Sequence, residues 1–493
     1  MLGRRTLLGA AAGAAVVAAG GLAYHEIRSH RDIFAPSDDP GDDVTGSATS
    51  TLHTRIDITP PVIDVKVPAA SGVAPGYVFL APKRGDIQPA LAILDNTGQL
   101  VWSDIYYAEV TDFRVQDYQG RPTLTYWYGQ GKWDHGVGQY ALVDSRYHQI
   151  GSVRVGGGYN GDLHEFHLTG DGTAMATIYH EVRADLSSVG GPADGWVWEG
   201  VAQEIDIATG RVLFEWHSLD HVPLSDSYYD IKDAGTRSTP YDYFHINSVD
   251  KNADGDYLIS SRCAHTLYKV DGRTGAVKWR LGGKRSHFDV ASDAVFRWQH
   301  CARFQPHGRI SAFDNHMSGH SRGLILNVDE SARRATLHRE YVSPEKLLAN
   351  FQANMEVLSN GNVFIGWGDQ PYFTEFAPDG TVLFHAGFRS GNSYRAYRAE
   401  WVAEPIDKPL VTAERHGDSM RVYVSWNGAT EVAAWRLSTG NDRSHLGAVH
   451  KGARAGFETA FTLPATRYVR ASALDRHGRV LGTSETVAVF TTG

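Results

Sequence analysis

The chain contains the phrase Phe244-His245-Ile246-Asn247-Ser248-Val249, which leads into the turn Asp254-Gly255. Three altered copies centre on His164, His300 and Asn354, and each ends in a turn with a glycine. His300 follows His245 by 55 residues, and Asn354 follows His300 by 54. A period near fifty residues is typical of propellers and related arrays. We therefore expect each phrase to form the innermost strand of a blade, so that the three histidines converge on a shared axis.

A second series of turns, out of phase with the first, counts the blades. Each turn starts at an aspartate and precedes a short strand; the six are Asp95, Asp144, Asp206, Asp271, Asp329 and Asp379. The gaps between them are 49, 62, 65, 58 and 50 residues. Asp or Asn with Gly between short β-forming runs is a strong hairpin signal. Six copies predict a six-bladed β-propeller of about four strands per blade, which we place at residues 61–404. A β-sandwich or unrelated hairpins would not explain two series in register.

The composition favours an all-β body. Aromatic residues make up 11% of the chain, glycine is frequent, and helical periodicity is scarce beyond the N-terminus, with one short helix predicted at 343–349. The net charge of −9 argues against a nucleic-acid partner, because phosphate binding needs a basic face.

A change in composition near Pro405 predicts a second domain at residues 405–493. Segments such as Val422–Trp426 and Tyr468–Leu474 alternate polar and apolar residues like half-buried strands. Short strands with an early tryptophan and a late tyrosine predict a fibronectin type III-like or immunoglobulin-like sandwich. We expect a spacer or adhesion role for it.

The N-terminus has the features of an export signal. Arg4-Arg5 precedes the uncharged stretch 6–24, which is typical of a twin-arginine signal, and Ala23 ends a small-residue cleavage site. The stretch 6–24 is also about long enough to span a bilayer, so the alternative is that residues 1–24 form an uncleaved membrane anchor. Residues 25–60 are predicted to form a flexible spacer. Either reading places the body outside the cytoplasm, in the periplasm, cell envelope or medium.

The chain has two cysteines, Cys263 and Cys301. An exported protein permits a disulfide. Sequence does not supply the Cα separation that a bridge requires, and the simpler interpretation is two small buried apolar residues.

Several of these fragments together resemble the arylsulfotransferase (arylsulfate sulfotransferase) family, in its shorter arylsulfotransferase-like branch. They are the His245 phrase, Ile259–Arg262, Trp279–Gly283, Gln299-His300 and Ser311–Asn315, in that order. The resemblance covers most of residues 75–400 and excludes the C-terminal domain. It implies a six-bladed propeller, in agreement with the turn count. One departure is His316, where the family usually has glycine after Asp-Asn.

The resemblance also implies an activity and a set of site residues. A histidine on an inner strand takes a sulfuryl group from a phenolic sulfate ester and passes it to a phenolic acceptor without a nucleotide donor. The motifs put the nucleophile at His300, sulfate-stabilising roles at His245 and Arg262, and the remaining active-site histidine at His164.

These residue types suit sulfuryl transfer on chemical grounds as well. Displacement at sulfur needs a neutral imidazole as nucleophile and fixed donors for three oxygens. Arginine's planar fork suits such an oxyanion. A phenol leaves or attacks more easily as phenolate, so one flanking histidine should act as general acid and then as base. The sequence therefore predicts a ping-pong scheme through a sulfohistidine.

The same residues also permit other readings. A histidine on an inner strand can simply tie blades together, and the strongest rival function is a non-catalytic extracellular propeller that binds a ligand or protein partner. A quinone-dependent dehydrogenase would need carboxylates around calcium. No cofactor and no metal site are predicted: Asp250 to Gly255 mimics a calcium loop, but Ser261 stands where an acidic ligand is required. Tyr126 to Tyr128 could line an acceptor pocket or simply be strand residues. The natural substrates and the oligomeric state are not determined by the sequence.

Overall fold

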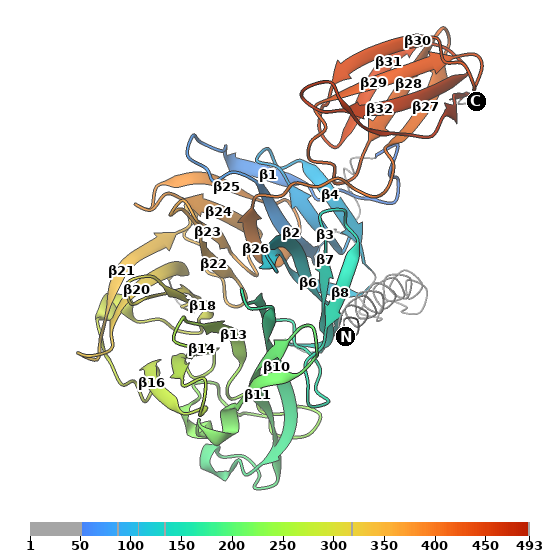
Figure 1. Ribbon diagram of the computed structural model, residues 1–493. Coiled ribbons are helices and arrows are strands. Elements are labelled where there is room, and N and C mark those ends of the chain that lie inside the picture. Colours follow the sequence, from blue (N-terminus) through green and yellow to red (C-terminus); the bar gives the residue numbers. More distant parts are fainter. Residues whose placement is uncertain (1–51, 86–87, 107, 133–134, 317–318, 492–493) are drawn as a thin grey trace, which may run out of the picture.

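The computed structural model describes residues 52–85, 88–106, 108–132, 135–316 and 319–491. The predicted signal or anchor at 1–24 and most of the spacer lie outside these residues. The described chain is all-β, which confirms the predicted class. Six sheets of four or five strands surround a common centre, and two further sheets form the C-terminal part (Figure 1). The strands of the six sheets pair antiparallel, except that β17 pairs parallel with β21.

Three of the six sheets come from the first half of the chain, apart from one late strand. In sheet order they are β26 (Asn392–Ala399), β2 (Tyr77–Lys83), β3 (Ala90–Leu94) and β4 (Leu100–Ile105); β5 (Glu109–Tyr118), β6 (Arg121–Lys132), β7 (His135–Val143) and β8 (Gln149–Val153); and β9 (Phe166–Leu168), β10 (Thr173–Ala184), β11 (Gly195–Asp206) and β12 (Val212–His217).

The other three sheets follow in chain order, with one early strand added to the last. They are β13 (Ile246–Lys251), β14 (Tyr257–Ser261), β15 (Thr266–Val270) and β16 (Val277–Gly282); β18 (His300–Gln305), β19 (Arg309–Asp314), β20 (Arg322–Asp329), β21 (Arg334–Val342) and β17 (Asp289–Val290); and β22 (Asn354–Val357), β23 (Val363–Gly366), β24 (Tyr372–Phe376), β25 (Val382–Phe388) and β1 (Ile63–Val67).

The six sheets close into a ring. Strand β5 contacts β26 on one side and β9 on the other, β10 contacts β13, and β13, β18, β22 and β26 follow in turn. The ring is joined by pairing between distant parts of the chain, because β26 pairs with β2 and β1 pairs with β25. The innermost strands of the six sheets are β26, β5, β9, β13, β18 and β22, and the strands of each sheet are counted outward from these.

The aspartate series falls at one equivalent position in all six sheets, the turn between the third and fourth strands. In each turn the aspartate Oδ1 accepts a nearby backbone N–H, at 2.8 Å from Thr97 to Asp95 and 2.9 Å from Thr381 to Asp379, for example. Aspartate favours such turns because its carboxylate satisfies backbone donors two or three residues ahead. Gly255, at φ +84°, lies in one of the hairpins between first and second strands, where a side chain would be strained.

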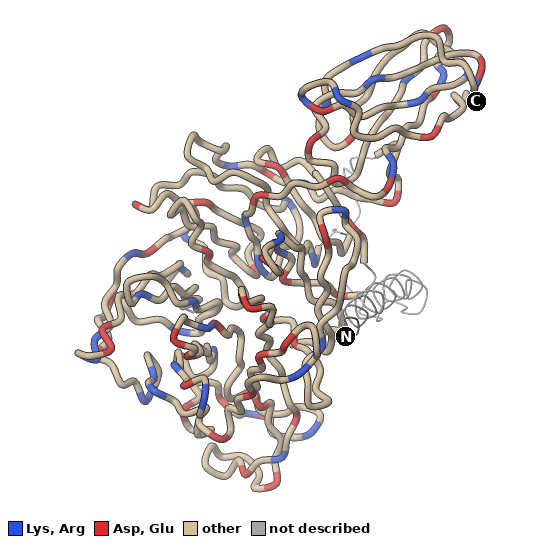
Figure 2. The backbone as a smooth tube through the Cα atoms, in the orientation of Figure 1, with Lys and Arg blue, Asp and Glu red and all other residues tan. Residues whose placement is uncertain are grey.

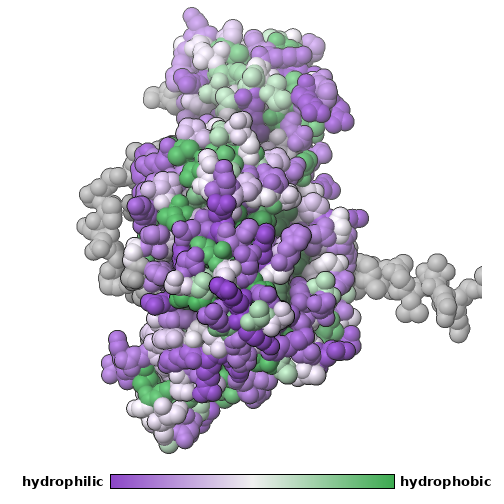
Figure 3. Space-filling view, turned by 90° about the vertical axis from the view of Figure 1, so that its left-hand side faces the viewer, coloured by the Kyte–Doolittle hydropathy of each residue, from purple (hydrophilic) through white to green (hydrophobic). Residues whose placement is uncertain are grey.

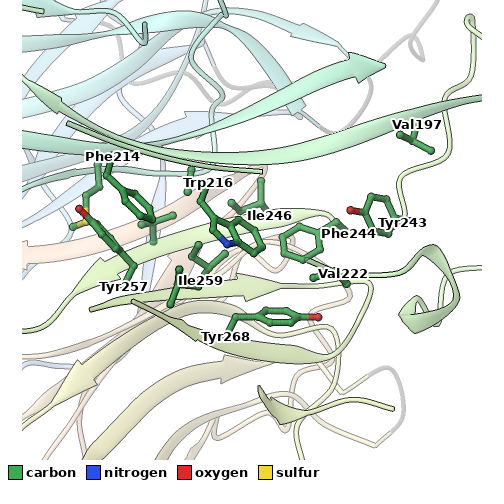
Figure 4. Packing of buried hydrophobic residues seen from close by; sticks show 14 of the residues in the cluster. Val197, Phe214, Trp216, Val222, Tyr243, Phe244, Ile246, Tyr257, Ile259 and Tyr268 are labelled. Atoms are coloured by element: carbon green, nitrogen blue, oxygen red, sulfur yellow. The ribbon is translucent and has the colours of Figure 1, made fainter. Parts of the chain in front are cut away.

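Apolar side chains fill the space between neighbouring sheets. Figure 4 shows one cluster, in which Trp216 of β12 packs near Phe244, and Phe214 stacks on Tyr257 of β14 with ring centroids 3.9 Å apart. Burial of one such large apolar side chain contributes roughly 1.5–3 kcal/mol relative to exposure. These contacts bring the third and fourth sheets together and set the position of the His245 phrase.

A cluster of charged side chains is buried at the centre of the ring. Glu165 accepts hydrogen bonds from Arg114 at 3.0 Å, Arg303 at 2.6 Å and Arg395 at 3.2 Å, and Arg395 also pairs with Asp112 at 3.1 Å. Burial alone would raise the pKa of Glu165, but the three arginines hold it well below its ordinary value. Strands of three separate sheets, β5, β18 and β26, thus meet on the carboxylate beside His164.

The C-terminal part has two sheets around one apolar cluster that includes Val422, Trp435 and Leu437. Their strands are β31 (Glu458–Pro464), β28 (Ser419–Ser425), β27 (Leu410–His416) and β35 (Phe490–Thr491) in one, and β30 (Ala448–Ala453), β29 (Ala434–Gly440), β32 (Tyr468–Leu474) and β33 (Val480–Thr483), with β34 (Val487–Ala488) on β32, in the other. Asn427 fixes this part to the ring, because its amide exchanges two hydrogen bonds with the Ser103 backbone, at 3.0 and 2.9 Å.

The described residues contain no α-helix, so the helix predicted at 343–349 is wrong. Lys346 has φ +52°, which breaks helical geometry within that segment. The part of the chain that the structure describes has four short 3-10 helices: η2 (Ser187–Val189), η3 (Ser218–Asp220), η4 (Leu224–Asp226) and η5 (Ser292–Ala294). Within the described ranges, no helix has the length and apolarity needed to cross a bilayer.

Residues of both charges are spread along the backbone of the described chain in Figure 2. The face in Figure 3 is mostly hydrophilic, with apolar residues in small scattered groups. Cys263 and Cys301 are both buried, and no disulfide joins them in the described structure. Trp127 belongs to the core, where its indole N–H donates to the Gly161 carbonyl at 3.0 Å.

Candidate active site

His300 is the first residue of β18, and its side chain is buried at the centre of the ring. Its Nδ1 faces two oxygens, Asn315 Oδ1 at 2.7 Å and the Trp298 carbonyl at 3.1 Å. The Asn315 amide nitrogen donates to the carbonyls of Ala349 and Gln352, which fixes its oxygen toward His300. Nδ1 must therefore carry the proton of the neutral ring. Nε2, which accepts the Gln352 N–H at 3.3 Å, holds the lone pair.

The surroundings of His300 favour its neutral form. Burial is the largest influence that lowers its pKa, followed by the positive charge of Arg262. The hydrogen bond to Asn315 acts in the opposite direction but is weaker, so the pKa of His300 lies well below its ordinary value of 6.5. A neutral imidazole with an unprotonated Nε2 is the form that can act as a nucleophile, once its electron pair leaves the hydrogen bond with the Gln352 N–H.

His164 lies just before β9 and is held by a carboxylate two residues earlier. Asp162 Oδ2 accepts both the His164 backbone N–H at 2.9 Å and Nδ1 at 2.7 Å. The same carboxylate accepts the Gly136 N–H at 2.8 Å and the Thr177 hydroxyl at 3.2 Å. Burial would raise the pKa of Asp162, yet its contacts with His164, His135 and Gly136 hold that pKa below its ordinary value.

His245 directly precedes β13 and pairs with Asp242 in the same manner. The two Asp242 oxygens face the His245 backbone N–H, at 3.1 Å, and Nδ1, in a short contact. His245 adopts φ +52°, as Trp298 (+57°) and Cys301 (+53°) do beside His300. Left-handed backbone at residues with large side chains costs on the order of 1–3 kcal/mol and is concentrated at functional sites.

The structure brings the three predicted histidines together although they lie far apart in the sequence. The ring centroids of His164 and His245 are 5.1 Å apart, and those of His245 and His300 are 6.5 Å apart. Tyr179 of β10 borders the first pair, with ring centroids 5.5 Å from His164 and 5.6 Å from His245. His245 is the middle ring of the three.

Arg262 follows β14 and completes the cluster. Its guanidinium carbon lies 4.8 Å from the centre of the Trp298 ring, and Nη2 donates to the Asn350 carbonyl at 3.3 Å. Its backbone N–H donates to the His245 carbonyl at 3.0 Å. The stack on Trp298 places this cation beside His300, whose pKa it lowers.

A cavity of 620 Å³ opens beside these residues. Its wall includes Arg262, Asp242 and Cys263, together with Trp198 and Tyr229 from neighbouring elements. The volume is within the usual range for small-molecule sites, and the aromatic rings can stack on a planar substrate. Residues within the 229–242 segment, which lies before β13, supply most of the cavity wall.

One group near the cavity has the ligand types of a metal site. Ligand atoms of Asp242, His245 and Cys263 lie within 4.8 Å of one another, and such a set could hold a soft divalent cation. The direct hydrogen bond between Asp242 and His245 already accounts for two of the three side chains, so we treat them as a hydrogen-bonded pair.

Other polar residues of the repeated phrases are structural. Asn247 donates to the Gln299 carbonyl at 2.7 Å, and Ser248 accepts the Ala302 N–H at 2.9 Å, so both side chains satisfy backbone groups. Asn354 holds the backbone of Ala396 through two hydrogen bonds of 2.8 and 2.9 Å. The fourth phrase thus ties two sheets together.

Sequence reasoning missed the partners that orient the histidines. Asp162 and Asp242 lie two and three residues before their histidines, so an Asp-x-His or Asp-x-x-His pattern was a usable signal. Asn315 stood out only as the end of the Ser311–Asn315 motif, and no sequence pattern links Trp298 to Arg262.

A protein-family model described as Arylsulfotransferase (ASST) matches residues 114–389, more than half of the chain. The chain belongs to the arylsulfotransferase family. This confirms the resemblance seen in the sequence, and the matched span includes all four predicted site residues. Membership in the arylsulfotransferase family supports a sulfotransferase-type enzyme and implies phenolic substrates in general.

No curated protein matches this arylsulfotransferase-family chain. Among solved structures, a Bacteroides caccae protein of unknown function is 14% identical, with a TM-score of 0.40, and the match covers 66% of this chain and 98% of that one. Saccharomyces cerevisiae Sqt1 is 11% identical, with a TM-score of 0.32 and coverages of 72% and 79%. A Staphylococcus aureus virginiamycin B lyase is 6% identical, with a TM-score of 0.34 and coverages of 74% and 97%. These similarities are too low to bear on function.

Proposed function

We propose that the protein transfers a sulfuryl group from a phenolic sulfate ester to a phenolic acceptor by a ping-pong mechanism. His300 attacks sulfur through Nε2 and forms a sulfohistidine, and His245, His164 and Arg262 hold the sulfuryl oxygens. The observation that carries the proposal is the difference between the Nδ1 partners. An uncharged amide, Asn315, faces His300, whereas carboxylates face the other two histidines.

This difference fits the chemistry. A carboxylate stabilises an imidazolium and so favours a proton donor, while an amide oxygen orients the ring without stabilising a positive charge as strongly. Once His300 carries the sulfuryl group on Nε2, the ring proton remains on Nδ1, which donates it in hydrogen bonds to Asn315 Oδ1 and the Trp298 carbonyl. The sulfated ring then remains positively charged, which makes it a good leaving group in the second half-reaction.

The experiment uses p-nitrophenyl sulfate as donor and phenol as acceptor. We expect release of p-nitrophenol that depends on phenol, and loss of this turnover by at least about 10³-fold in His300→Ala. His338→Ala, which changes an exposed histidine of β21, is the matched control and should retain full activity.

Mass spectrometry after brief exposure to donor should find an acid-labile sulfuryl adduct on the peptide that holds His300. Absence of both p-nitrophenol release and the adduct would contradict the proposed transfer and favour a non-catalytic propeller that binds a ligand or protein partner. Turnover that persists in His300→Ala would show that another residue is the nucleophile.

We also propose that residues 61–404 form a six-bladed β-propeller and residues 405–493 a fibronectin type III-like sandwich. The ring of six sheets and the two C-terminal sheets support this assignment. Residues 1–24 are proposed as a twin-arginine signal or membrane anchor and 25–60 as a spacer. N-terminal sequencing of the protein recovered from each compartment of a producing cell tests export and cleavage together.

A further inference from the structure

Arg262 is held differently from other arginines near the centre of the ring. Three of those pair with the Glu165 carboxylate: Arg114, Arg303 and Arg395. Among the described residues, Arg262 pairs with no carboxylate, and its side chain makes one hydrogen bond, from Nη2 to the Asn350 carbonyl at 3.3 Å. Its Nε N–H is buried and has no hydrogen-bond partner in the same part of the chain. The guanidinium therefore keeps donors available to an anion and needs a support of another kind.

The Trp298 ring supplies that support, because the Arg262 guanidinium carbon lies 4.8 Å from the centre of the ring. A carboxylate partner would occupy the N–H groups that a sulfuryl group needs, and its negative charge would repel that group. An aromatic face attracts the cation without occupying those donors in conventional hydrogen bonds. The contact with Trp298 thus suits an arginine that has to remain open to an oxyanion.

Two further rings lie behind Trp298. His265, which is buried between β14 and β15, meets the Trp298 ring edge to face, with centroids 4.4 Å apart. The other neighbour of His265 is Tyr228, which stacks on it face to face at 4.1 Å. Burial, followed by the positive charges of Arg297 and Arg262, lowers the pKa of His265 to about 3, so this ring is neutral and adds no repulsion. We call the three rings, Tyr228, His265 and Trp298, the aromatic stack.

The outer end of the aromatic stack is fixed beside the cavity wall. Tyr228 directly precedes Tyr229 of that wall, and its backbone N–H donates to the Cys263 carbonyl at 2.7 Å. The Lys284 ammonium lies 4.9 Å from the centre of the Tyr228 ring. The aromatic stack therefore extends from the segment that walls the cavity to the guanidinium of Arg262.

We propose that the aromatic stack positions the Arg262 guanidinium for the sulfuryl oxygens, with Trp298 in direct contact and the other two rings behind it. The proposal rests on the proposed sulfuryl transfer, in which Arg262 binds those oxygens. The three rings are positioning residues, because each acts through Arg262. The Trp298 carbonyl makes a separate contact, 3.1 Å from His300 Nδ1, which belongs to the backbone and is present in every side-chain variant.

The experiment is a double-mutant cycle of Trp298→Leu and Arg262→Ala, in which kcat/KM is measured for transfer from p-nitrophenyl sulfate to phenol. Leucine keeps an apolar side chain but offers no aromatic face to the cation. We expect Trp298→Leu to lower kcat/KM by about 10-fold and Arg262→Ala to lower it by about 10²-fold or more. The double variant should match Arg262→Ala within about 2-fold, because the ring acts only through the guanidinium. A purely structural role of Trp298 would instead multiply the two losses.

Tyr228→Leu and Tyr228→Phe test the outer end of the aromatic stack, where the side chain is 46% exposed and substitution leaves the core intact. We expect Tyr228→Leu to lower kcat/KM by about 3-fold or more, whereas Tyr228→Phe keeps the ring and should stay within about 2-fold of the wild type. Trp196→Leu is the matched control, because the Trp196 ring lies near two other guanidinium groups, 5.2 Å from Arg183 and 4.9 Å from Arg237. Its kcat/KM should remain within about 2-fold of the wild type.

An unchanged kcat/KM in Trp298→Leu or Tyr228→Leu, multiplied losses in the double variant, or equal losses in the two Tyr228 variants would overturn the proposal. If Trp298→Leu does not fold, as judged by circular dichroism, Trp298→Phe takes its place in the cycle, with an expected loss of about 3-fold. If the wild-type protein transfers no sulfuryl group, the proposed function itself fails, and this proposal fails with it. If wild-type transfer and the His300 adduct are intact but the losses multiply, only the role of the aromatic stack fails.

Discussion

At the scale of single residues, the atom that faces Nδ1 sets what each histidine of the cluster can do. The Nδ1 partner of His300 is the uncharged Asn315 amide. Burial and the nearby Arg262 guanidinium lower the pKa of His300, and the hydrogen bond to Asn315 raises it to a smaller extent. His164 and His245 combine the same ring with a carboxylate. The three imidazole rings lie with neighbouring centroids no more than 6.5 Å apart, yet their Nδ1 atoms face different partners.

The pH dependence of the reaction should report the state of His300. Because the pKa of His300 lies well below 6.5, we expect its protonation to cause no loss of kcat/KM as the pH falls through 6.5. In Asn315→Asp the added negative charge should raise that pKa, so that kcat/KM falls off at a higher pH than in the wild type. Steady-state kinetics across pH measure the shift.

Asn315→Leu is the control for this variant, because it removes the hydrogen bond without adding a charge. It should reduce kcat/KM at every pH and leave the position of the acid limb unchanged. An Asn315→Asp profile that overlays the wild-type profile would show that Asn315 does not control the protonation of His300.

At the scale of strands and turns, the polar residue that begins each repeated phrase has one of two tasks. His245 and His300 present rings to the centre, whereas Asn354 uses both ends of its amide on the backbone of Ala396. This is a direct link between β22 and β26, the strand that closes the ring. An amide is suited to the task because it can donate and accept at once.

Asn354→Leu should destabilise the protein by ~2–4 kcal/mol, because it leaves a buried N–H and a buried C=O of Ala396 without partners. The free energy of unfolding from denaturant titration measures the loss. Asn160→Leu, at an exposed position between β8 and β9, is the matched control and should change stability by less than about 0.5 kcal/mol. Equal stability of both variants and the wild type would contradict the role given to Asn354.

At the scale of the whole molecule, buried charges join the sheets beside the histidine cluster. Arg114, Arg303 and Arg395 converge on Glu165, and Glu356 of β22 lies close enough for Arg114 and Arg303 to influence its titration. Removal of one partner from such a buried set is costly because it leaves charges uncompensated. The network therefore fixes the backbone beside His164 from several sheets at once.

Glu356 predicts a pH dependence of stability. Burial raises its pKa to about 7, while the arginines reduce the effect. The carboxyl of Glu356 then keeps its proton in the folded protein, whereas in the unfolded chain it loses that proton near about pH 4.3. The contribution of this residue to the free energy of unfolding is therefore complete below about pH 4.3 and is lost as the pH rises through about 7. Glu356→Gln should flatten the fall in stability between pH 5 and about 7. Denaturant titrations at several pH values measure the slope, and an unchanged slope would contradict the assignment.

The sequence alone determined those features that depend on residues close together in the chain. The aspartate turns recur between the third and fourth strands of six sheets because each carboxylate satisfies its own turn, and the histidine phrases begin inner strands because strand and hairpin signals are local. The incorrect helix at 343–349 shows the limit, since its residues allow a helix that the neighbouring backbone does not adopt.

Only the tertiary structure decided how those parts combine. The pairing of β26 with β2, the Asn315 amide facing His300, the Arg262 stack on Trp298 and the arginines around Glu165 join residues that are separate in the sequence. Their partners depend on which sheets become neighbours and on how much water each side chain retains. Packing between sheets buries Asp162 completely and leaves Asp242 in the cavity wall. No local sequence pattern encodes this difference in exposure.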